Sequence, residues 1–420
     1  MAQKRLKTGD RVRHVTVIGA GAVGASTALA LRRDGHAVTL IDRGQPGMGT
    51  SFGNAGILSV ASCVPIATPG VLWRLPHLLA DPLGPLHIDW RYLPRLAPWL
   101  MRFVLASRPA RVEEISRALM SLLVQILPAY RELLGGAFQD LTHPGGVLYA
   151  YQTDRSFEGA MAGHELRKRR GVNLSVLGQA ELRQMEPALA PSFRHGVLMH
   201  DSYNTVNPLR LVQTLTQTFL EAGGELVQES VARIERDGGR LVAVTDKRWI
   251  ELDMVAICAG AWSKKLARDC GVRVPLDTER GYHVMLPHPG ALPQRPVASG
   301  DHEFIATPME HGLRLAGTVE LAGLDAPPNL QRADVLLRAA REMFPGLRDD
   351  GMTTWMGFRP SMPDSIPVIG PAPGEPRVFL GFGHGHLGLT FGAITGLLLS
   401  DLIAGRPPRV DLAPFRADRF

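Results

Sequence analysis

The sequence has 420 residues, enough for two or three domains, and its 45% hydrophobic and 20% charged residues are ordinary for a globular protein, which argues against long disordered segments. The net charge of +6 comes mostly from scattered arginines, so the chain lacks the clustered basic patch of a nucleic-acid-binding protein. The 3 cysteines include no CxxC pair, so we expect neither structural disulfides nor a metal site, and a reducing compartment fits.

The N-terminal residues 1–14 are polar and basic, and no apolar stretch typical of a secretory signal follows them. A membrane span needs about 18 to 20 uninterrupted apolar residues. The nearest approach, "LGLTFGAITGLLLSDLIAG" at 387–405, carries glycines and threonines and contains Asp401. We therefore expect a buried helix there and a cytoplasmic protein.

Residues 14–42, "HVTVIGAGAVGASTALALRRDGHAVTLID", predict a strand, a tight turn, a helix and a second strand. Gly19, Gly21 and Gly24 form GxGxxG where the first strand meets the helix. In this motif the first glycine allows the turn, the second lets backbone amides approach a pyrophosphate, and the third lets the helix pack on the sheet. Asp42 closes the second strand, where an acid usually binds ribose hydroxyls. The segment therefore predicts a dinucleotide site.

Residues 43–56, "RGQPGMGTSFGNAG", are rich in glycine and small side chains. Such a segment lets the backbone pass close to a large flat ligand, although composition alone also fits a flexible surface loop. Its position between the nucleotide motif and the apolar "ILSVAS" favours the ligand-binding interpretation.

Residues 65–135 are rich in Leu, Trp, Arg and Pro, with helical spacing from Trp99 onward. We favour helices that cover the cofactor domain. The alternative is an amphipathic face carrying Trp73, Trp90 and Trp99 that lies on a membrane surface.

The middle of the chain alternates strands and helices. A strand is expected at 145–153, a helix at 178–187 and strands within 225–236 and 241–246. Asn207 is a natural N-cap before Pro208, and Gly223 ends the helix that follows.

An apolar strand at 253–258 runs into a small-residue turn at Ala259 and Gly260, which again admits a ligand closely. Two further segments, "PLDTERGYHVMLP" (275–287) and "HEFIATPMEHGLRLAGTVE" (302–320), have the pattern of sheet strands. Because such strands alternate with the cofactor elements, we expect two interleaved domains.

A second glycine-rich turn lies near the C-terminus, where "VFLGFG" leads through "HGHLG" into the long apolar helix. Two turns with exposed amides at opposite ends of the chain suit an elongated cofactor with two demanding ends. FAD meets this description, because its ring gains negative charge on reduction and a helix N-terminus stabilises that charge. His384 and His386 offer only two metal ligands, so we interpret them as turn residues beside the cofactor.

The segment "GFRPSMPDSIPVIG", residues 357–370, mounts Arg359 on a proline-stiffened arm shortly before this turn. If a flavin lies between the two turns, Arg359 is a two-pronged donor for a substrate carboxylate, a geometry that lysine cannot supply. The alternative is a buried ion pair between Arg359 and Asp364.

Taken together, the glycine motif, "SFGNAG" (51–56), the "GFRP…PDSIPVIG" arm and the "GHGHLG…GLLLSDLIAG" ending resemble the FAD-dependent D-amino-acid oxidase and dehydrogenase superfamily. Bacterial D-amino-acid dehydrogenases are the most similar members, and the resemblance runs from about residue 14 to residue 405. The family acid after the second strand is commonly glutamate, whereas this chain has Asp42.

The resemblance implies that Arg359 binds the substrate carboxylate, with Tyr282 as a second contact or a pocket wall. A residue that serves only in packing is the alternative for Tyr282. His283 is a candidate base, although hydride transfer requires none. It also implies contacts to FAD by two groups of residues, in and after the first motif and around the second turn: Gly19, Ala20, Gly21, Val23, Gly24, Asp42, Arg43, Thr50, Ser51, Asn54, Ala55 and Gly56; and Val231, Ala259, Gly260, Gly383, His384, Gly385, His386, Leu387, Gly388, Leu389 and Thr390.

The expected fold is α/β, with a Rossmann-type FAD-binding domain (14–62, about 178–270 and 350–405). It is interleaved with an α+β substrate domain and covering helices (about 63–177 and 271–349), and the substrate domain contains a mostly antiparallel sheet. The expected function is oxidative deamination of a D-amino acid to a 2-oxo acid, by hydride transfer to flavin N5.

Electrons would pass to a quinone or another respiratory carrier, with oxygen as an alternative acceptor. Cyclic or secondary amino acids (hydroxy-D-proline, D-proline, sarcosine) or glycine are alternative substrates. A non-catalytic flavin-binding subunit is the alternative of another class. No nucleic-acid partner is expected, and peripheral contact with the inner face of the membrane stays open.

Overall fold

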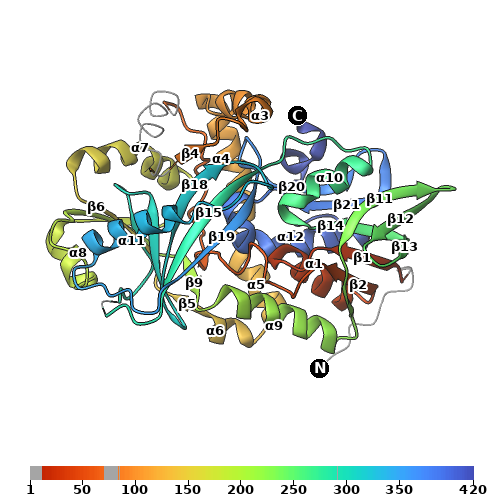
Figure 1. The fold of residues 1–420 in the computed structure, drawn as a ribbon, viewed down its shortest axis with the longest axis horizontal. Coiled ribbons are helices and arrows are strands. Elements are labelled where there is room, and N and C mark those ends of the chain that lie inside the picture. Colours follow the sequence, from red (N-terminus) through yellow and green to blue (C-terminus); the bar gives the residue numbers. More distant parts are fainter. Residues whose placement is uncertain (1–11, 71–83, 85, 291) are drawn as a thin grey trace.

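The computed structural model describes residues 12–70, 84, 86–290 and 292–420. The fold is α/β, and its two halves lie next to each other along the long axis of the molecule (Figure 1). One half contains a six-stranded sheet with its helices, and the other contains a nine-stranded sheet, both counted over the described residues. The chain passes between the halves several times, so the expected interleaving is observed.

The six-stranded sheet has the Rossmann arrangement. Its strands lie in the order β10 (Glu225–Gln228), β2 (Ala37–Asp42), β1 (His14–Ile18), β14 (Met254–Ile257), β21 (Glu375–Phe382) and β20 (Val368–Ala372). All neighbouring pairs are parallel except β20 with β21. In such sheets, ligands bind beyond the carboxyl ends of the strands.

The two faces of this sheet are covered differently, as the period of two along a strand requires. Val15 and Val17 of β1 point toward three helices, α1 (Ala22–Arg33), α9 (Pro208–Glu221) and α12 (Gly388–Ile403). Ile18 points toward α10 (Ser263–Asp269) and the small sheet β11–β12–β13 (Val231–Asp237, Arg240–Thr245, Trp249–Leu252). The predicted cap of α9 is confirmed, because the Asn207 side chain accepts a hydrogen bond from the Arg210 amide at 3.1 Å.

The larger sheet is mostly antiparallel. Its order is β19 (Thr353–Ser361), β15 (Asp277–Leu286), β18 (Gly312–Leu321), β17 (Phe304–Met309), β16 (Val297–Ser299), β6 (Val147–Tyr151), β8 (His195–Met199) and β7 (Leu174–Leu177), with β4 (Leu86–Ile88) beside β18. Helix α11 (Gln331–Met343) packs against one face of this sheet, and α8 (Gln179–Met185) packs beside β8. A third small sheet joins β3 (Ile57–Leu58), β9 (Tyr203–Thr205) and β5 (Thr142–Pro144).

The expected domain boundaries need two corrections. The expected FAD-binding segments include α8 with β8, and β19, but both strands pair within the larger sheet and α8 packs beside β8. The reason is that β19 is long enough to pair with β15 along nine residues before the chain crosses to β20. The part of the 357–370 arm that carries Arg359 therefore belongs to the substrate half, whereas the end of the arm, in β20, belongs to the six-stranded sheet.

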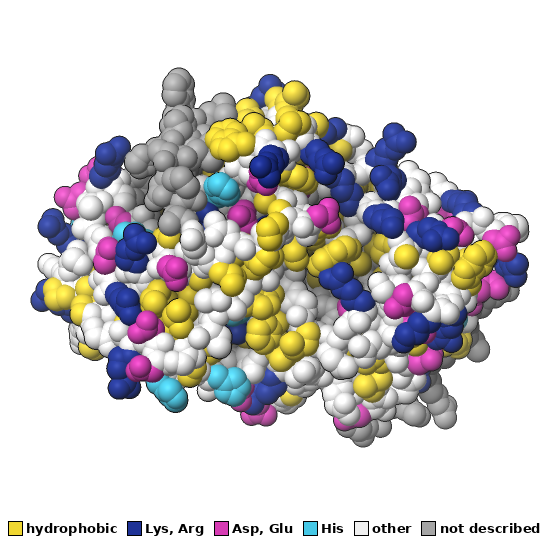
Figure 2. Space-filling model, in the orientation of Figure 1, with side chains coloured by type: hydrophobic (Ala, Val, Ile, Leu, Met, Phe, Trp, Pro, Cys, Tyr) yellow, Lys and Arg dark blue, Asp and Glu magenta, His cyan; other side chains and the backbone are white. Residues whose placement is uncertain are grey.

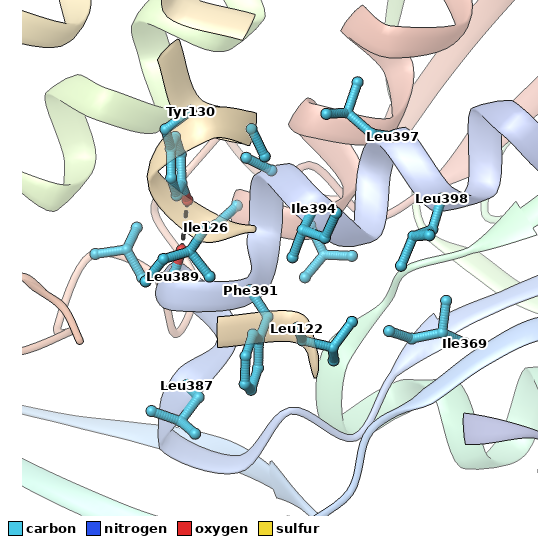
Figure 3. Close-up of a cluster of buried hydrophobic side chains, with 14 of the residues drawn as sticks. Leu122, Ile126, Tyr130, Ile369, Leu387, Leu389, Phe391, Ile394, Leu397 and Leu398 are labelled. Atoms are coloured by element: carbon cyan, nitrogen blue, oxygen red, sulfur yellow. Dashed lines mark hydrogen bonds between the residues drawn. The ribbon is translucent and has the colours of Figure 1, made fainter. Parts of the chain in front are cut away.

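Helix α12 is the central helix of the first half. Figure 3 shows its side chains interleaved with those of α4 (Pro109–Leu123) and α5 (Ile126–Leu134), and the Tyr130 hydroxyl donates a hydrogen bond to the Leu389 carbonyl. Residues 385–403 are the one stretch in the described parts of the chain that is long and apolar enough to cross a membrane, and 83% of it is buried within the protein. The prediction of a buried helix is confirmed.

The described chain has three further α-helices, α3 (Leu93–Ala106), α6 (Ala137–Leu141) and α7 (Asp154–Arg169). It also has four 3-10 helices, at Gly260–Trp262, Gly385–Leu387, Ala413–Phe415 and Ala417–Arg419. Of the three tryptophans considered for a membrane-facing surface, Trp73 lies outside the described residues. Trp99 is buried, and Trp90 is 66% exposed.

Candidate active site

A cavity of about 1910 Å³ lies where the two halves meet. Typical small-molecule sites have about 300 to 1,000 Å³, so this one has room for a dinucleotide and a further small ligand. Its walls come from the glycine motif and the loop after β2, from the turn before α12, and from the cavity-facing residues of β15, β18 and β19.

The glycine motif builds the end of the cavity at the N-terminus of α1. A side chain on Gly19, whose φ is +105°, would collide with the Cys258 carbonyl at 2.5 Å, and one on Gly24 would collide with the Gly19 carbonyl at 1.7 Å. A side chain on Gly21 would contact only the Ser51 hydroxyl, at 3.3 Å. Gly19 and Gly24 thus allow the backbone to pack closely. Gly21 instead keeps space open at the N-terminus of α1, which has no acidic residue in its first turn.

Asp42 binds the loop backbone. One carboxylate oxygen accepts from the Ala20 amide at 2.6 Å and the other from the Gly44 amide at 2.9 Å. Asp42 borders the cavity, so a ribose contact stays a prediction, while the observed role of its carboxylate is to hold the glycine turn against the loop that follows. Next to it, the Arg43 guanidinium lies 3.9 Å from the centre of the Trp262 ring.

The two glycine-rich segments lie side by side, as predicted. The Asn54 side-chain amide donates to the His386 carbonyl at 3.4 Å, and the Thr390 hydroxyl donates to the Ile57 carbonyl at 2.9 Å. Arg314 fixes the first segment by donating to the carbonyls of Phe52 and Asn54, at 2.8 and 2.7 Å. Segments more than 330 positions apart in the sequence therefore form one continuous wall.

Of the residues predicted to bind FAD, all line the cavity except Gly24, Gly56 and Gly383. These three glycines are needed by the backbone: Gly56 and Gly383 have φ of +76° and +82°, and Gly24 packs against Gly19. His384 is buried, its Nε2 lies 3.0 Å from the Thr395 hydroxyl, and burial lowers its pKa to about 3. No cluster of metal-binding side chains occurs among the described residues.

Arg359 lies in the cavity wall contributed by β19. Its guanidinium donates to the Thr318 carbonyl at 2.9 Å and to the Gly317 carbonyl at 3.3 Å. These two bonds leave other N–H groups of the five on the guanidinium for a ligand. Burial lowers the pKa of Arg359, and the nearby Glu279 carboxylate opposes that shift.

The alternative pairing of Arg359 with Asp364 is wrong. Asp364 accepts from Arg419 at 3.0 Å and lies 3.6 Å from Arg111. The guanidinium of Arg359 is therefore held by backbone carbonyls at the cavity, as the carboxylate-binding interpretation requires.

Tyr282 borders the cavity, as its pocket-wall alternative predicts, but its role as a second contact to the carboxylate needs correction, and so does the role of His283 as a base. Although Tyr282 borders the cavity, its side chain packs in the cluster under α11, and its hydroxyl donates to Glu320 at 2.5 Å and accepts from the Asn329 amide at 2.9 Å. Its hydroxyl is thus engaged on the other side of the sheet from Arg359.

His283 is absent from the cavity wall. Its ring stacks on Trp355 with centres 5.1 Å apart, Nδ1 lies 3.2 Å from the Gly53 carbonyl, and burial lowers its pKa to about 3. A neutral ring in this position supports the loop at Gly53 and is not placed to act as a base.

Glu279, which no sequence pattern indicates, is the cross-strand neighbour of Arg359 between β15 and β19 and lines the cavity. Glu279 is 5% exposed; burial raises the pKa of its carboxyl, and Arg359 acts in the opposite direction. An acid two residues before a glycine in a strand is not distinctive in one sequence. Only the strand register could have identified it.

Comparison with known proteins agrees with this geometry. The family described as FAD dependent oxidoreductase matches residues 14–402. The chain belongs to that family. FAD is therefore the cofactor of this FAD-dependent oxidoreductase, and the predicted family, fold class and cofactor are confirmed.

Two relatives of this FAD-dependent oxidoreductase align along nearly their whole length. It is 42% identical to a D-amino-acid oxidase from Bradyrhizobium diazoefficiens, over 97% of this chain and 99% of the relative. It is 32% identical to a D-amino acid dehydrogenase from Paramagnetospirillum magneticum, over 97% and 98% of the two chains. Among solved structures, glycine oxidase from Geobacillus kaustophilus shares the fold with a TM-score of 0.71 at 22% identity, covering 98% of this chain and 100% of that one.

The residues of the cavity fit FAD. The N-terminus of α1, which has no acidic residue in its first turn, and the open space at Gly21 suit the pyrophosphate, and the turn at 385–390 supplies further backbone groups to the same cavity. Two basic residues, Arg43 and Lys264, also line the cavity, which suits an anionic cofactor.

Proposed function

We propose that this oxidoreductase converts a D-amino acid to a 2-oxo acid and passes the electrons to a respiratory acceptor. The observation that carries the proposal is the seating of Arg359, a guanidinium on a rigid strand with free N–H groups at a cavity that fits FAD. A planar, permanently charged donor on a strand binds a carboxylate bidentately and fixes the orientation of the rest of the substrate.

The chemistry that FAD supplies when bound is acceptance of a hydride from the substrate Cα, with the imine product hydrolysed by water. The protein contributes orientation: Arg359 anchors the carboxylate, and Gly281 leaves room beside the guanidinium because a side chain there would lie 2.2 Å from its Nη2. Neither His283 nor Tyr282 is placed to move a proton, so the substrate amine enters in its neutral form.

Anaerobic mixing of the holoenzyme with matched D- and L-amino acids tests the proposal. We expect the flavin absorbance to bleach with D-amino acids and not with their L-enantiomers. The panel includes glycine and the secondary amines sarcosine, D-proline and hydroxy-D-proline, because each of them presents the same carboxylate to Arg359. Bleaching by none of these compounds would identify a non-catalytic flavin subunit and overturn the proposal.

The electron acceptor is tested by reoxidising the reduced enzyme. The two relatives bear the names oxidase and dehydrogenase. We expect a soluble quinone analogue to restore the flavin absorbance faster than air-saturated buffer does. Faster reoxidation by oxygen, with stoichiometric hydrogen peroxide, would assign the enzyme as an oxidase.

A further inference from the structure

Helix α3 packs against the protein through one side only. Leu96 and Trp99 are buried, and Phe103 is partly buried. The rings of Trp99 and Phe103 stack with centres 5.3 Å apart, and the Trp99 indole donates to the Ser361 carbonyl at 3.2 Å. These contacts explain why the helix is attached to the substrate half. They leave its opposite side without a partner in the described chain.

That opposite side is apolar. At 3.6 residues per turn, positions 94, 97, 98, 101 and 105 fall on one side of α3, away from positions 96, 99 and 103. These positions hold Pro94, Ala97, Pro98, Met101 and Leu105, and all five residues are exposed. Met101 is 67% exposed and Leu105 is 45% exposed. Trp90, in the turn before the helix, is 66% exposed. Figure 2 shows hydrophobic side chains gathered at the top of the molecule, where α3 lies in Figure 1.

Arginines border this apolar surface. Arg91, Arg95 and Arg102 share one edge of it by the same helical spacing, and Arg108 follows the helix. All four are exposed, and none of them forms an ion pair with a carboxylate in the described part of the chain. Between Asp89 and Glu113 the sequence contains no acidic residue. By contrast, Arg111, just beyond, pairs with Glu114 at 2.9 Å.

We propose that this surface of α3, formed by Trp90, Pro94, Ala97, Pro98, Met101 and Leu105 with the bordering arginines, docks on an anionic phospholipid membrane. Exposed apolar side chains next to unpaired basic ones are the pattern of helices that lie in a membrane interface. The apolar side chains enter the acyl boundary, and the arginines bind lipid phosphates.

A second copy of the chain is a poorer occupant. A two-fold contact through α3 would place the arginines of one copy against the same arginines of the other, and neither copy supplies a carboxylate on this surface. A negatively charged bilayer satisfies the apolar surface and the arginines together.

Docking would bring the bilayer close to the active-site cavity. Helix α3 leads through Arg108 directly into Pro109 and Ala110 at the start of α4, and both of these residues line the cavity. The proposal concerns attachment and does not depend on which amino acid is oxidised.

The test is flotation of the holoenzyme with vesicles, read by flavin absorbance in the lipid fraction. We expect binding to vesicles of equal parts phosphatidylcholine and phosphatidylglycerol, little binding to phosphatidylcholine alone, and release by salt. An arginine near such a surface contributes a roughly fivefold change in affinity, so the triple variant Arg91→Gln, Arg95→Gln, Arg102→Gln should bind about 100-fold more weakly.

The matched control is Arg183→Gln, Arg194→Gln, Arg338→Gln, which removes the same charge from exposed arginines without ion pairs elsewhere in the described chain. It should bind like the wild type. A second variant, Trp90→Ser with Met101→Ser, should bind more weakly at unchanged net charge. All variants should retain flavin and amino-acid oxidation.

Two results would overturn the proposal: wild-type enzyme that ignores anionic vesicles, or a control triple that loses as much affinity as the α3 triple. If the α3 triple does not fold, the apolar variant and the salt response of the wild type decide. A dimer in sedimentation that dissociates on Trp90→Ser with Met101→Ser, together with no vesicle binding, would assign the surface to a second copy instead.

Discussion

The substitution Gly281→Ala tests the seat of Arg359 without touching the arginine. A β-carbon on Gly281 would lie 2.2 Å from Nη2, 2.3 Å from Cζ and 2.7 Å from Nε of Arg359. These distances are too short for any contact, but the obstructing atoms are the end of a flexible side chain. We therefore expect the protein to fold and the guanidinium to leave its position between the carbonyls of Gly317 and Thr318.

The size of the effect follows from the bonds at stake. A hydrogen bond to a charged group contributes about 1.5 to 3 kcal/mol, and 1.4 kcal/mol is a factor of ten. A displaced guanidinium that keeps one of its two bonds to the substrate carboxylate should lower kcat/KM by about 10- to 100-fold. Because the carboxylate also sets the orientation of Cα, kcat should fall together with the rise in KM.

Steady-state kinetics with an artificial electron acceptor measures this effect, with flavin content read from the visible spectrum. The control is Gly145→Ala, because a β-carbon there meets nothing within 4 Å and Gly145 has no positive φ. Equal flavin content with unchanged kcat/KM in Gly281→Ala would show that the seated guanidinium does not bind the substrate.

Three further predictions use different parts of the structure. Arg359→Lys should raise KM strongly and lower kcat, because an ammonium cannot bind a carboxylate with two parallel bonds; unchanged kinetics would contradict the proposed clamp. Gly21→Val should give folded but colourless protein, because its side chain would meet only the Ser51 hydroxyl and then extend into the cavity; a fully yellow variant would refute the pyrophosphate assignment. Burial, with Arg167 and Lys168, lowers the pKa of His164 to about 4 from 6.5, so below pH 6.5 the unfolded chain takes up a proton that the folded chain does not. Stability should therefore fall by about 1.5 kcal/mol from this residue between pH 6.5 and 5, and His164→Gln should remove that part of the pH dependence, measured by denaturant unfolding at both pH values.

The cofactor site could be predicted in unusual detail because its parts are local in sequence. The glycine motif, the strand before it and the acid after β2 obey spacings that follow from backbone geometry. The second turn was predicted for the same reason, since a strand, a glycine-rich turn and a helix are recognisable wherever they occur. The contact between the two segments, through Asn54 and His386, could be predicted because one ligand has to touch both of them.

The substrate half was less predictable because its chemistry depends on strand register. Adjacent residues of a strand face opposite sides of the sheet. Whether the side chain of Tyr282 or that of Glu279 faces the cavity therefore depends on which face of β15 borders it. The bulge between Arg280 and Tyr282 further changes the pairing with β18. Nothing in the sequence near "ERGYH" marks that bulge or distinguishes Glu279 from the residues around it.

Strand register also determines which acidic residue lies near Arg359. The nearest acid along the chain, Asp364, follows the end of β19 and is bound by Arg419, whose position near the C-terminus no local pattern indicates. The acid that does approach Arg359 is its cross-strand neighbour Glu279. Which charged side chains lie near each other on neighbouring strands is set by the pairing of the sheet and is not visible as a spacing in one chain.

The backbone of β18 is strained at the position where it binds the Arg359 guanidinium. Thr318 has a φ of +57°, a conformation that a β-branched residue adopts at a cost of about 1 to 3 kcal/mol. It sits in the bulge, where β18 has one residue more than β15 between Gly317 and Glu320. In a regular ladder the carbonyls of Gly317 and Thr318 would point in opposite directions along the sheet, whereas here both accept from one guanidinium. A strained residue whose carbonyl and the preceding one both accept from Arg359 is consistent with an arginine that is held in a fixed orientation for a ligand.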